Sequence, residues 1–122
     1  MDRPDCSIVH HAALQSELEQ LARDDRREYA AVRNAILKLK ASDGRLGYPW
    51  TSAVRGPDRG GLRELRPRAG HSRVRVLYAQ RSSMTLLLAL AREGGDNPRA
   101  FHRAVLAAQR RLAAMTDDGV ST

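Results

Sequence analysis

The sequence predicts an α+β fold in which an N-terminal helical hairpin packs on a small twisted antiparallel sheet and a C-terminal helix follows. Three observations predict it. Apolar residues recur at helical spacing over residues 11–41, three short apolar runs separated by brief turns fill residues 62–91, and helical spacing returns after residue 97. A chain of 122 residues has room for one hydrophobic core, so we expect a single domain over residues 1–122 with disordered ends at 1–6 and 116–122.

The hairpin is expected to follow a short candidate strand at residues 7–10. Asp24 or Asp25 can accept hydrogen bonds from the free N–H groups that begin a second helix, so a break is expected near residue 24. Ser42, Asp43 and Gly44 end the pattern. The apolar positions that face the core are Leu14, Leu18, Leu21 and Ala22 in the first helix, and Tyr29, Val32, Ile36 and Leu39 in the second.

The sheet should begin after an irregular loop at residues 43–61, which is rich in glycine and proline. Short connections make the three strands that follow antiparallel. Alternation in the second of them puts Val74, Val76 and Tyr78 on one face and Arg73, Arg75 and Leu77 on the other. The third is almost continuously apolar, which indicates a central strand covered on both faces. The predicted strands span residues 62–66, 72–80 and 84–91.

The last helix is predicted to begin where Asp96 or Asn97 can cap it and Pro98 can occupy its first turn. Spacing separates a buried stripe from an exposed side. The stripe is Phe101, Val105, Ala108 and Leu112, and the exposed arginines are Arg99, Arg103, Arg110 and Arg111.

Positive charge is concentrated in one segment of the chain. Residues 55–92 hold nine arginines against Asp58 and Glu64, which equals the net charge of +7, whereas the remainder balances. The arginines alternate with apolar residues, so they are expected to stand in rows on a sheet face. Such a surface fits a polyanion, and nucleic acid is the polyanion that suits it.

Several classes of protein are excluded by what the sequence lacks. The lone Cys6 allows neither an internal disulfide nor a thiolate zinc site, and the histidines at 10, 11, 71 and 102 lack the spacing of metal ligands. There is no phosphate-binding glycine loop, so we expect neither a metal nor another cofactor. No signal peptide is visible and no apolar run could span a bilayer, which predicts a cytoplasmic protein without a membrane partner.

The polar residues near the arginines suit the internal cleavage of RNA. That reaction activates a 2′-hydroxyl, stabilises an anionic phosphorane and protonates a leaving oxygen. Guanidinium groups bind phosphate oxygens in pairs and stay charged. Proton transfer could come from Glu64, His71 or Tyr78, or stay incomplete and give a slow enzyme.

Three segments resemble the HigB-like branch of the RelE/ParE toxin superfamily. They are residues 46–49 (Leu-Gly-Tyr-Pro), residues 61–67 (Gly-Leu-Arg-Glu-Leu-Arg-Pro) and residues 74–79 (Val-Arg-Val-Leu-Tyr-Ala), and the likeness extends over about residues 14–115. It implies a toxin of a type II toxin–antitoxin system, a ribosome-dependent mRNA endonuclease that inhibits translation. It also implies a cognate antitoxin, expected to be a helix-turn-helix protein, with operator DNA bound only through the complex of the two proteins.

The resemblance assigns site residues one by one. It puts the family's sheet arginine at Arg75, the basic residue that ends the last strand at Arg92, and a cleft-facing glutamate at Glu64. Relatives often carry paired basic residues where this chain has Arg92 followed by Glu93. Phe101 or His102 lies near the position where some relatives have an aromatic residue.

Alternatives remain for both residues and function. Arg75 can pair with Glu64 across adjacent strands, bind the scissile phosphate, or do both. Tyr78 favours core packing over catalysis, and Trp50 is expected to fix its loop to the sheet. The chain could instead resemble the ParE members, which poison DNA gyrase, or be a basic binding module without catalysis. The residues expected to contact phosphates are Arg63, Arg66, Arg68 and Arg73.

Overall fold

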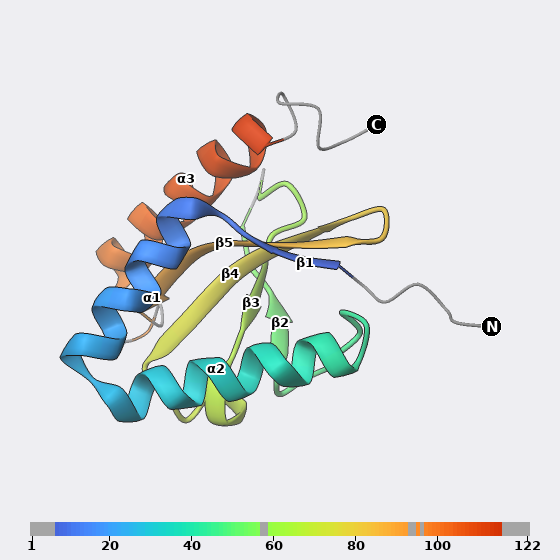
Figure 1. Cartoon of the computed structure of the whole chain (residues 1–122). Coiled ribbons are helices and arrows are strands. Elements are labelled where there is room, and N and C mark those ends of the chain that lie inside the picture. The colour runs from blue at the N-terminus through green and yellow to red at the C-terminus, as the bar shows by residue number, and fades with distance from the viewer. Residues whose placement is uncertain (1–6, 57–58, 93–94, 96, 116–122) are drawn as a thin grey trace.

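The computed structural model describes residues 7–56, 59–92, 95 and 97–115; the predicted disordered ends lie outside these ranges. It contains three α-helices, one short 3₁₀ helix and a five-stranded sheet (Figure 1). This is the predicted α+β class. In chain order the elements are β1 (Ser7–His10), α1 (Ala12–Asp24), α2 (Arg26–Ala41), β2 (Thr51–Ala53), β3 (Arg63–Leu65), the 3₁₀ helix η1 (Pro67–Gly70), β4 (Val74–Arg81), β5 (Met84–Arg92) and α3 (Pro98–Met115).

The helix boundaries are set by side chains that the sequence already indicates. Asp25 separates α1 from α2, and its carboxylate accepts a hydrogen bond from the Glu28 backbone N–H at 3.2 Å. The side-chain oxygen of Asn97 accepts from the backbone N–H of Ala100 at 3.1 Å and caps α3. The predicted break and cap are therefore confirmed, while the alternative cap Asp96 lies outside the described residues.

The sheet has the order β1-β5-β4-β3-β2, and two of its features differ from the sequence prediction. The three predicted strands, β3, β4 and β5, are antiparallel as expected, but β1 pairs with β5 in parallel, so the sheet is mixed. No short turn joins β1 to its neighbour, because the hairpin leads the chain away first. Residues 51–53 were expected to be irregular; they form β2 because they pair with β3, a contact between distant residues that local sequence does not encode.

Two buried clusters lie on opposite faces of the sheet. On one face, Val74, Val76 and Tyr78 of β4 pack with residues of α1 and α2, and on the other Leu77 packs with residues of α3, as the alternation predicted. Figure 1 shows how the three helices are arranged about the sheet. The central strand β5 contributes Leu87 to the first cluster and Leu86 and Leu88 to the second. Consequently each residue of β3 and β4 belongs either to a hairpin-side face or to an α3-side face.

An ion pair fastens α1 and α3 to the margin of β5. Arg111 was expected to be exposed with the other arginines of α3, but its Nη2 lies 2.9 Å from Glu17 Oε2 and its side chain is only 20% exposed. Glu17 Oε1 also accepts from the backbone N–H of Leu90 at 2.9 Å, and Arg111 Nη1 donates to the Leu88 carbonyl at 2.8 Å. The prediction that Arg111 is exposed was wrong, because its partner Glu17 lies in a different helix, far from Arg111 in the sequence.

Candidate functional site

Glu64 is the centre of the candidate site. It lies in the middle of β3, opposite Leu77 of β4, and therefore on the α3-side face, whereas its neighbour Leu65 joins the hairpin-side core. Its side chain is 15% exposed and one carboxylate oxygen lies 3.3 Å from Arg66 Nη1. The other oxygen lies 3.7 Å from Arg75 Nε. The structure thus places one partly accessible carboxylate between two guanidinium groups.

Arg75 is the buried member of this group, with a side chain only 3% exposed. Besides its ion pair with Glu64, it donates from Nη1 to the Val74 carbonyl at 3.1 Å and from Nη2 to the Gly70 carbonyl at 3.4 Å. It also donates to the carbonyl of Ser72. These contacts join β4, the η1 turn and β3, so the cross-strand ion pair considered for Arg75 is present.

Arg66 is the more accessible cation, with a side chain 21% exposed. Its Nε donates to the Pro49 carbonyl at 3.0 Å, and its guanidinium carbon lies 5.5 Å from the centre of the Tyr48 ring. Gly70 has a φ of 96°, and a Cβ there would stand 2.5 Å from Arg66 Nη2. A side chain at residue 70 would therefore displace the guanidinium.

An open hollow of about 310 Å³ surrounds the accessible part of this group. Its polar lining comes from β2, β3 and the adjoining loops, and α3 contributes the aromatic ring of Phe101. The lining combines two arginines, one carboxylate and two aromatic rings, which suits an anionic ligand with a flat part. The residues that line it are Tyr48, Ser52, Ala53, Val54, Arg55, Glu64, Arg66 and Phe101.

A second hollow, of about 740 Å³, gathers three other predicted site residues. His71, Arg73 and Arg92 line it together with acidic residues of the α1–α2 junction, Asp24, Asp25 and Glu28. Ala100 in the first turn of α3 borders this hollow, and the adjacent Phe101 borders the first. The first turn of α3 thus separates the two groups of predicted residues.

The remaining predicted residues lie on the hairpin side. Tyr78 is fully buried in the hairpin-side core, and its hydroxyl accepts from Arg63 Nε at 3.3 Å. Arg68 turns toward α2, where its Nη1 lies 3.4 Å from Glu28 Oε2. The structure therefore does not bring Tyr78, Arg63 or Arg68 together with Glu64.

The expectation that the arginines form rows on one sheet face is wrong. Arg63 and Arg66 lie on opposite faces of the sheet. Arg63 is two residues from Leu65 and shares its hairpin-side face, whereas Arg66, the residue after β3, lines the first hollow with Glu64. Arg75 is buried, and Arg81 donates to the backbone carbonyl of Gly60 at 3.0 Å. Positive charge is therefore distributed around the sheet: Arg55 and Arg66 line the first hollow, Arg73 and Arg92 the second, and the exposed Arg68 lies against α2.

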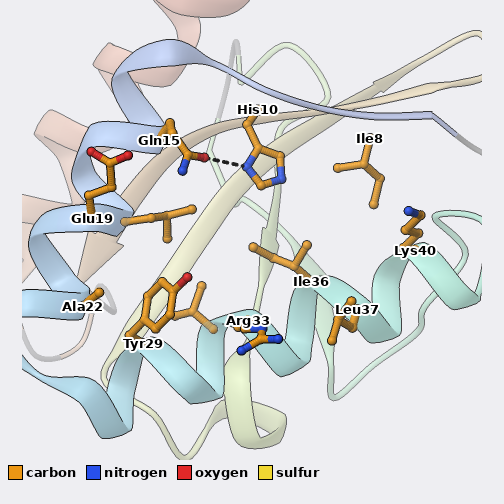
Figure 2. A pocket seen from close by; sticks show the side chains of 12 residues that line it. Ile8, His10, Gln15, Glu19, Ala22, Tyr29, Arg33, Ile36, Leu37 and Lys40 are labelled. Atoms are coloured by element: carbon orange, nitrogen blue, oxygen red, sulfur yellow. Dashed lines mark hydrogen bonds between the residues drawn. The ribbon is translucent and has the colours of Figure 1, made fainter.

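A third hollow, of about 370 Å³, lies between α1, α2 and β1 and has a mainly apolar lining (Figure 2). Ile8, Leu18, Val32 and Ile36 line its apolar part, and His10 contacts Gln15 at its rim with a ring-nitrogen to amide-oxygen distance of 3.2 Å. None of the predicted site residues lines it. It is a groove on the hairpin side, remote in the fold from Glu64.

The loop before β2 contains the residue that sequence reasoning missed. Trp50 was expected to fix this loop to the sheet. Its backbone carbonyl does accept from the Arg66 N–H next to β3 at 2.7 Å, but its ring lies against α2, where Lys38 Nζ is 3.8 Å from the ring centre. Tyr48 is instead 77% exposed at the hollow. The position of Tyr48 between Gly47 and Pro49 in a predicted loop was the sequence feature that could have indicated an exposed ring.

The described residues offer no cluster of three or more His, Cys, Asp or Glu side chains that could hold a metal ion. Within the same residues, no helix has the length and apolar character needed to cross a membrane.

Comparison with known proteins gives a likeness at the level of structure. No family model matches the sequence. No curated protein matches it significantly. A YoeB/ParE toxin from Agrobacterium tumefaciens superposes with a TM-score of 0.54 at 16% identity, covering 71% of this chain and 98% of that one. A YoeB–YefM toxin–antitoxin heterotetramer from Staphylococcus aureus gives 0.48 at 14% identity, covering 69% and 92%. The chain therefore shares the fold of a YoeB/ParE toxin, which agrees with the fold that the sequence resemblance implies; membership of the RelE/ParE superfamily and of its HigB-like branch stays a prediction.

Proposed function

We propose that this chain is the toxin of a type II toxin–antitoxin system and acts as a ribosome-dependent mRNA endonuclease that inhibits translation. The observation that carries the proposal is the carboxylate of Glu64, held between Arg66 and Arg75 at the edge of an open hollow. Cleavage of RNA by its own 2′-hydroxyl requires a general base for the hydroxyl proton and cationic groups that stabilise the charge on the phosphate, and a carboxylate beside guanidinium groups can provide both. The shared fold supports the proposal only at the level of architecture.

In the proposed reaction Glu64 accepts the proton of the ribose 2′-hydroxyl. The 2′-oxygen then forms a bond to phosphorus while the bond between phosphorus and the 5′-oxygen breaks, which leaves a 2′,3′-cyclic phosphate and a 5′-hydroxyl. The 5′-oxygen takes its proton from water. Arg66 binds the non-bridging phosphate oxygens, whose negative charge increases in the transition state. The reaction needs no cofactor.

Arg75 is a positioning residue in this proposal, because its guanidinium is buried and occupied by backbone carbonyls and Glu64. Its part is to fix the carboxylate and the η1 turn that carries Gly70. Arg73 and Arg92 line the second hollow and bind phosphates of the same strand on the other side of the first turn of α3. Tyr78 serves the core rather than the reaction.

The proposed partner is a cognate antitoxin, expected to be a helix-turn-helix protein, that neutralises the chain and brings it to operator DNA. An acidic segment of that partner would gain most by covering the two hollows or by moving α3, whose Ala100 and Phe101 border both. Either arrangement would exclude mRNA from Glu64.

Inducible expression with pulse labelling tests the function. The wild-type chain should arrest growth, and incorporation of amino acid into protein should fall before incorporation of thymidine into DNA. Glu64→Gln should relieve the arrest, because the amide keeps the shape of the side chain but is a poor proton acceptor. Glu19→Gln, at an exposed glutamate of α1 on the other side of the sheet, is the matched control and should stay toxic.

The outcome also separates the alternatives. A gyrase-directed toxin would reduce DNA synthesis first, and a basic binding module would leave growth unchanged at good soluble expression. Either result would overturn the nuclease proposal, as would full toxicity of Glu64→Gln.

A further inference from the structure

Tyr48 is an aromatic ring left in solvent at the border of the candidate site. It is 77% exposed, against 54% for Leu37 and 40% for Leu106, the other large exposed hydrophobic side chains among the described residues. Burying such a ring in the core would be favourable, since aromatic side chains bury more area than most others. Its exposure at a hollow lined by charged residues leaves one face of the ring available to a ligand.

The ring is held in place although it is exposed. The Arg66 guanidinium lies 5.5 Å from the ring centre, within the range of a cation–π contact. Arg66 is in turn fixed by Glu64 and by the carbonyl of Pro49, the residue that follows Tyr48. A ring fixed in this way loses little conformational freedom when a second flat group stacks on it, which favours binding.

The surroundings of the ring determine which flat group fits. Arg55 and Arg66 line the same hollow and can bind phosphate, while Phe101 provides a second ring from α3. The exposed Leu37 and Leu106 belong to α2 and α3 rather than to this loop, so Tyr48 is not part of a contiguous apolar patch. Aromatic rings beside basic side chains are instead the usual means of binding single-stranded RNA, whose unpaired bases stack on them.

We propose that Tyr48 is a stacking platform for one base of the RNA strand, next to the phosphate that Arg66 binds. The inference rests on the proposed nuclease function and adds a base-binding subsite to it. Stacking fixes one nucleotide relative to Glu64 and so aligns the strand for in-line attack. Because every base has a flat face, the platform contributes affinity with only a modest preference among bases.

Binding of a short single-stranded RNA with a 2′-deoxy nucleotide at the cleaved position, followed by fluorescence anisotropy, tests the platform. Tyr48→Ala should weaken binding about 5- to 150-fold, the loss expected for one base–aromatic stack, whereas Tyr48→Phe should retain it. Leu37→Ala, which removes an exposed side chain of α2, is the matched control and should bind as the wild type does.

A scan with abasic nucleotides identifies the stacked base. At the position of the stacked base, removing the base should weaken binding to the wild type as much as Tyr48→Ala weakens binding of the intact RNA. Removing the same base should weaken binding to Tyr48→Ala little further, because the stack is already lost. In a translation extract, Tyr48→Ala should cut the same mRNA with a higher KM and altered relative use of its sites. Equal binding and an equal cleavage pattern for Tyr48→Ala and the wild type would overturn the platform alone. A wild-type chain that neither binds the RNA nor cuts mRNA on ribosomes would overturn the proposed function, and the platform with it.

Discussion

Two arginines contact the same carboxylate, and we expect replacement by methionine to separate their roles. Arg75 lies 3.7 Å from Glu64 with a side chain 3% exposed, whereas Arg66 lies nearer, at 3.3 Å, but is 21% exposed. If distance decided the contribution to stability, Arg66 would be the more important. We expect burial to decide instead, because water screens the Arg66 pair and replaces its hydrogen bonds.

The magnitudes follow from the contacts that each change removes. Arg75→Met leaves Glu64 without its buried partner and removes the donor from the carbonyls of Gly70, Ser72 and Val74. Breaking a buried pair costs about 3–5 kcal/mol of the free energy of unfolding. Arg66→Met removes a partly exposed pair and one hydrogen bond to Pro49, for which we expect about 0.5–1.5 kcal/mol.

Urea unfolding measures the loss of stability in each variant, and RNA cleavage by the folded protein measures the catalytic role of Arg66. With a slope of about 2 kcal/mol per M, Arg75→Met should lower the unfolding midpoint by about 2 M and Arg66→Met by less than about 0.8 M. Cleavage by folded Arg66→Met should fall about 100- to 1,000-fold, because it loses a donor to the transition state. Equal stability losses, or a larger loss for Arg66→Met, would refute the assignment of Arg75 as the buried support of Glu64.

Two further predictions concern other parts of the molecule. Glu17→Ala and Arg111→Ala should each destabilise the chain by about 1–3 kcal/mol, and the double variant should cost clearly less than the sum, while exposed Glu19→Ala should change stability by under about 0.5 kcal/mol. Full additivity in urea unfolding would show that the pair is not coupled. Because the chain carries a net charge of +7, stopped-flow association with an acidic antitoxin should slow about tenfold between about 0.05 and 0.5 M salt, and mRNA cleavage should be lost in the complex. A flat salt dependence, or a complex that still cuts, would mean that the partner binds away from the hollows.

The features that sequence predicted are those encoded by local pattern. Asp25 between two apolar stripes was enough to locate the helix break, and alternation in β4 was enough to separate Val76 from Leu77. Strand β2 escaped prediction because Thr51–Ala53 become a strand only by pairing with β3. Arg111 was misjudged for the same reason, since Glu17 lies in a different helix.

Within the site, the family resemblance located Glu64 and Arg75, and their pairing across adjacent strands was expected as one alternative. Arg63 was expected to contact phosphate, but period-two alternation puts it on the hairpin-side face with Tyr78. The nearly complete burial of Arg75 also has no local signal, because three backbone carbonyls around the η1 turn provide its surroundings. Charge counting identified the segment that carries the site, but the orientation of each guanidinium depends on the fold.

The ion pair between Glu17 and Arg111 limits how this sheet can associate with other chains. Strand β1 ends at His10, opposite Leu87, so the rest of β5 would present a row of unsatisfied backbone groups. There the Leu90 N–H donates to Glu17 and the Leu88 carbonyl accepts from Arg111, so a foreign strand would have to displace both side chains to form those hydrogen bonds. Among the described strands, the outer margins of the sheet are β1 and β2, which are four and three residues long. The chain is thereby protected from edge-to-edge aggregation along its most hydrophobic strand.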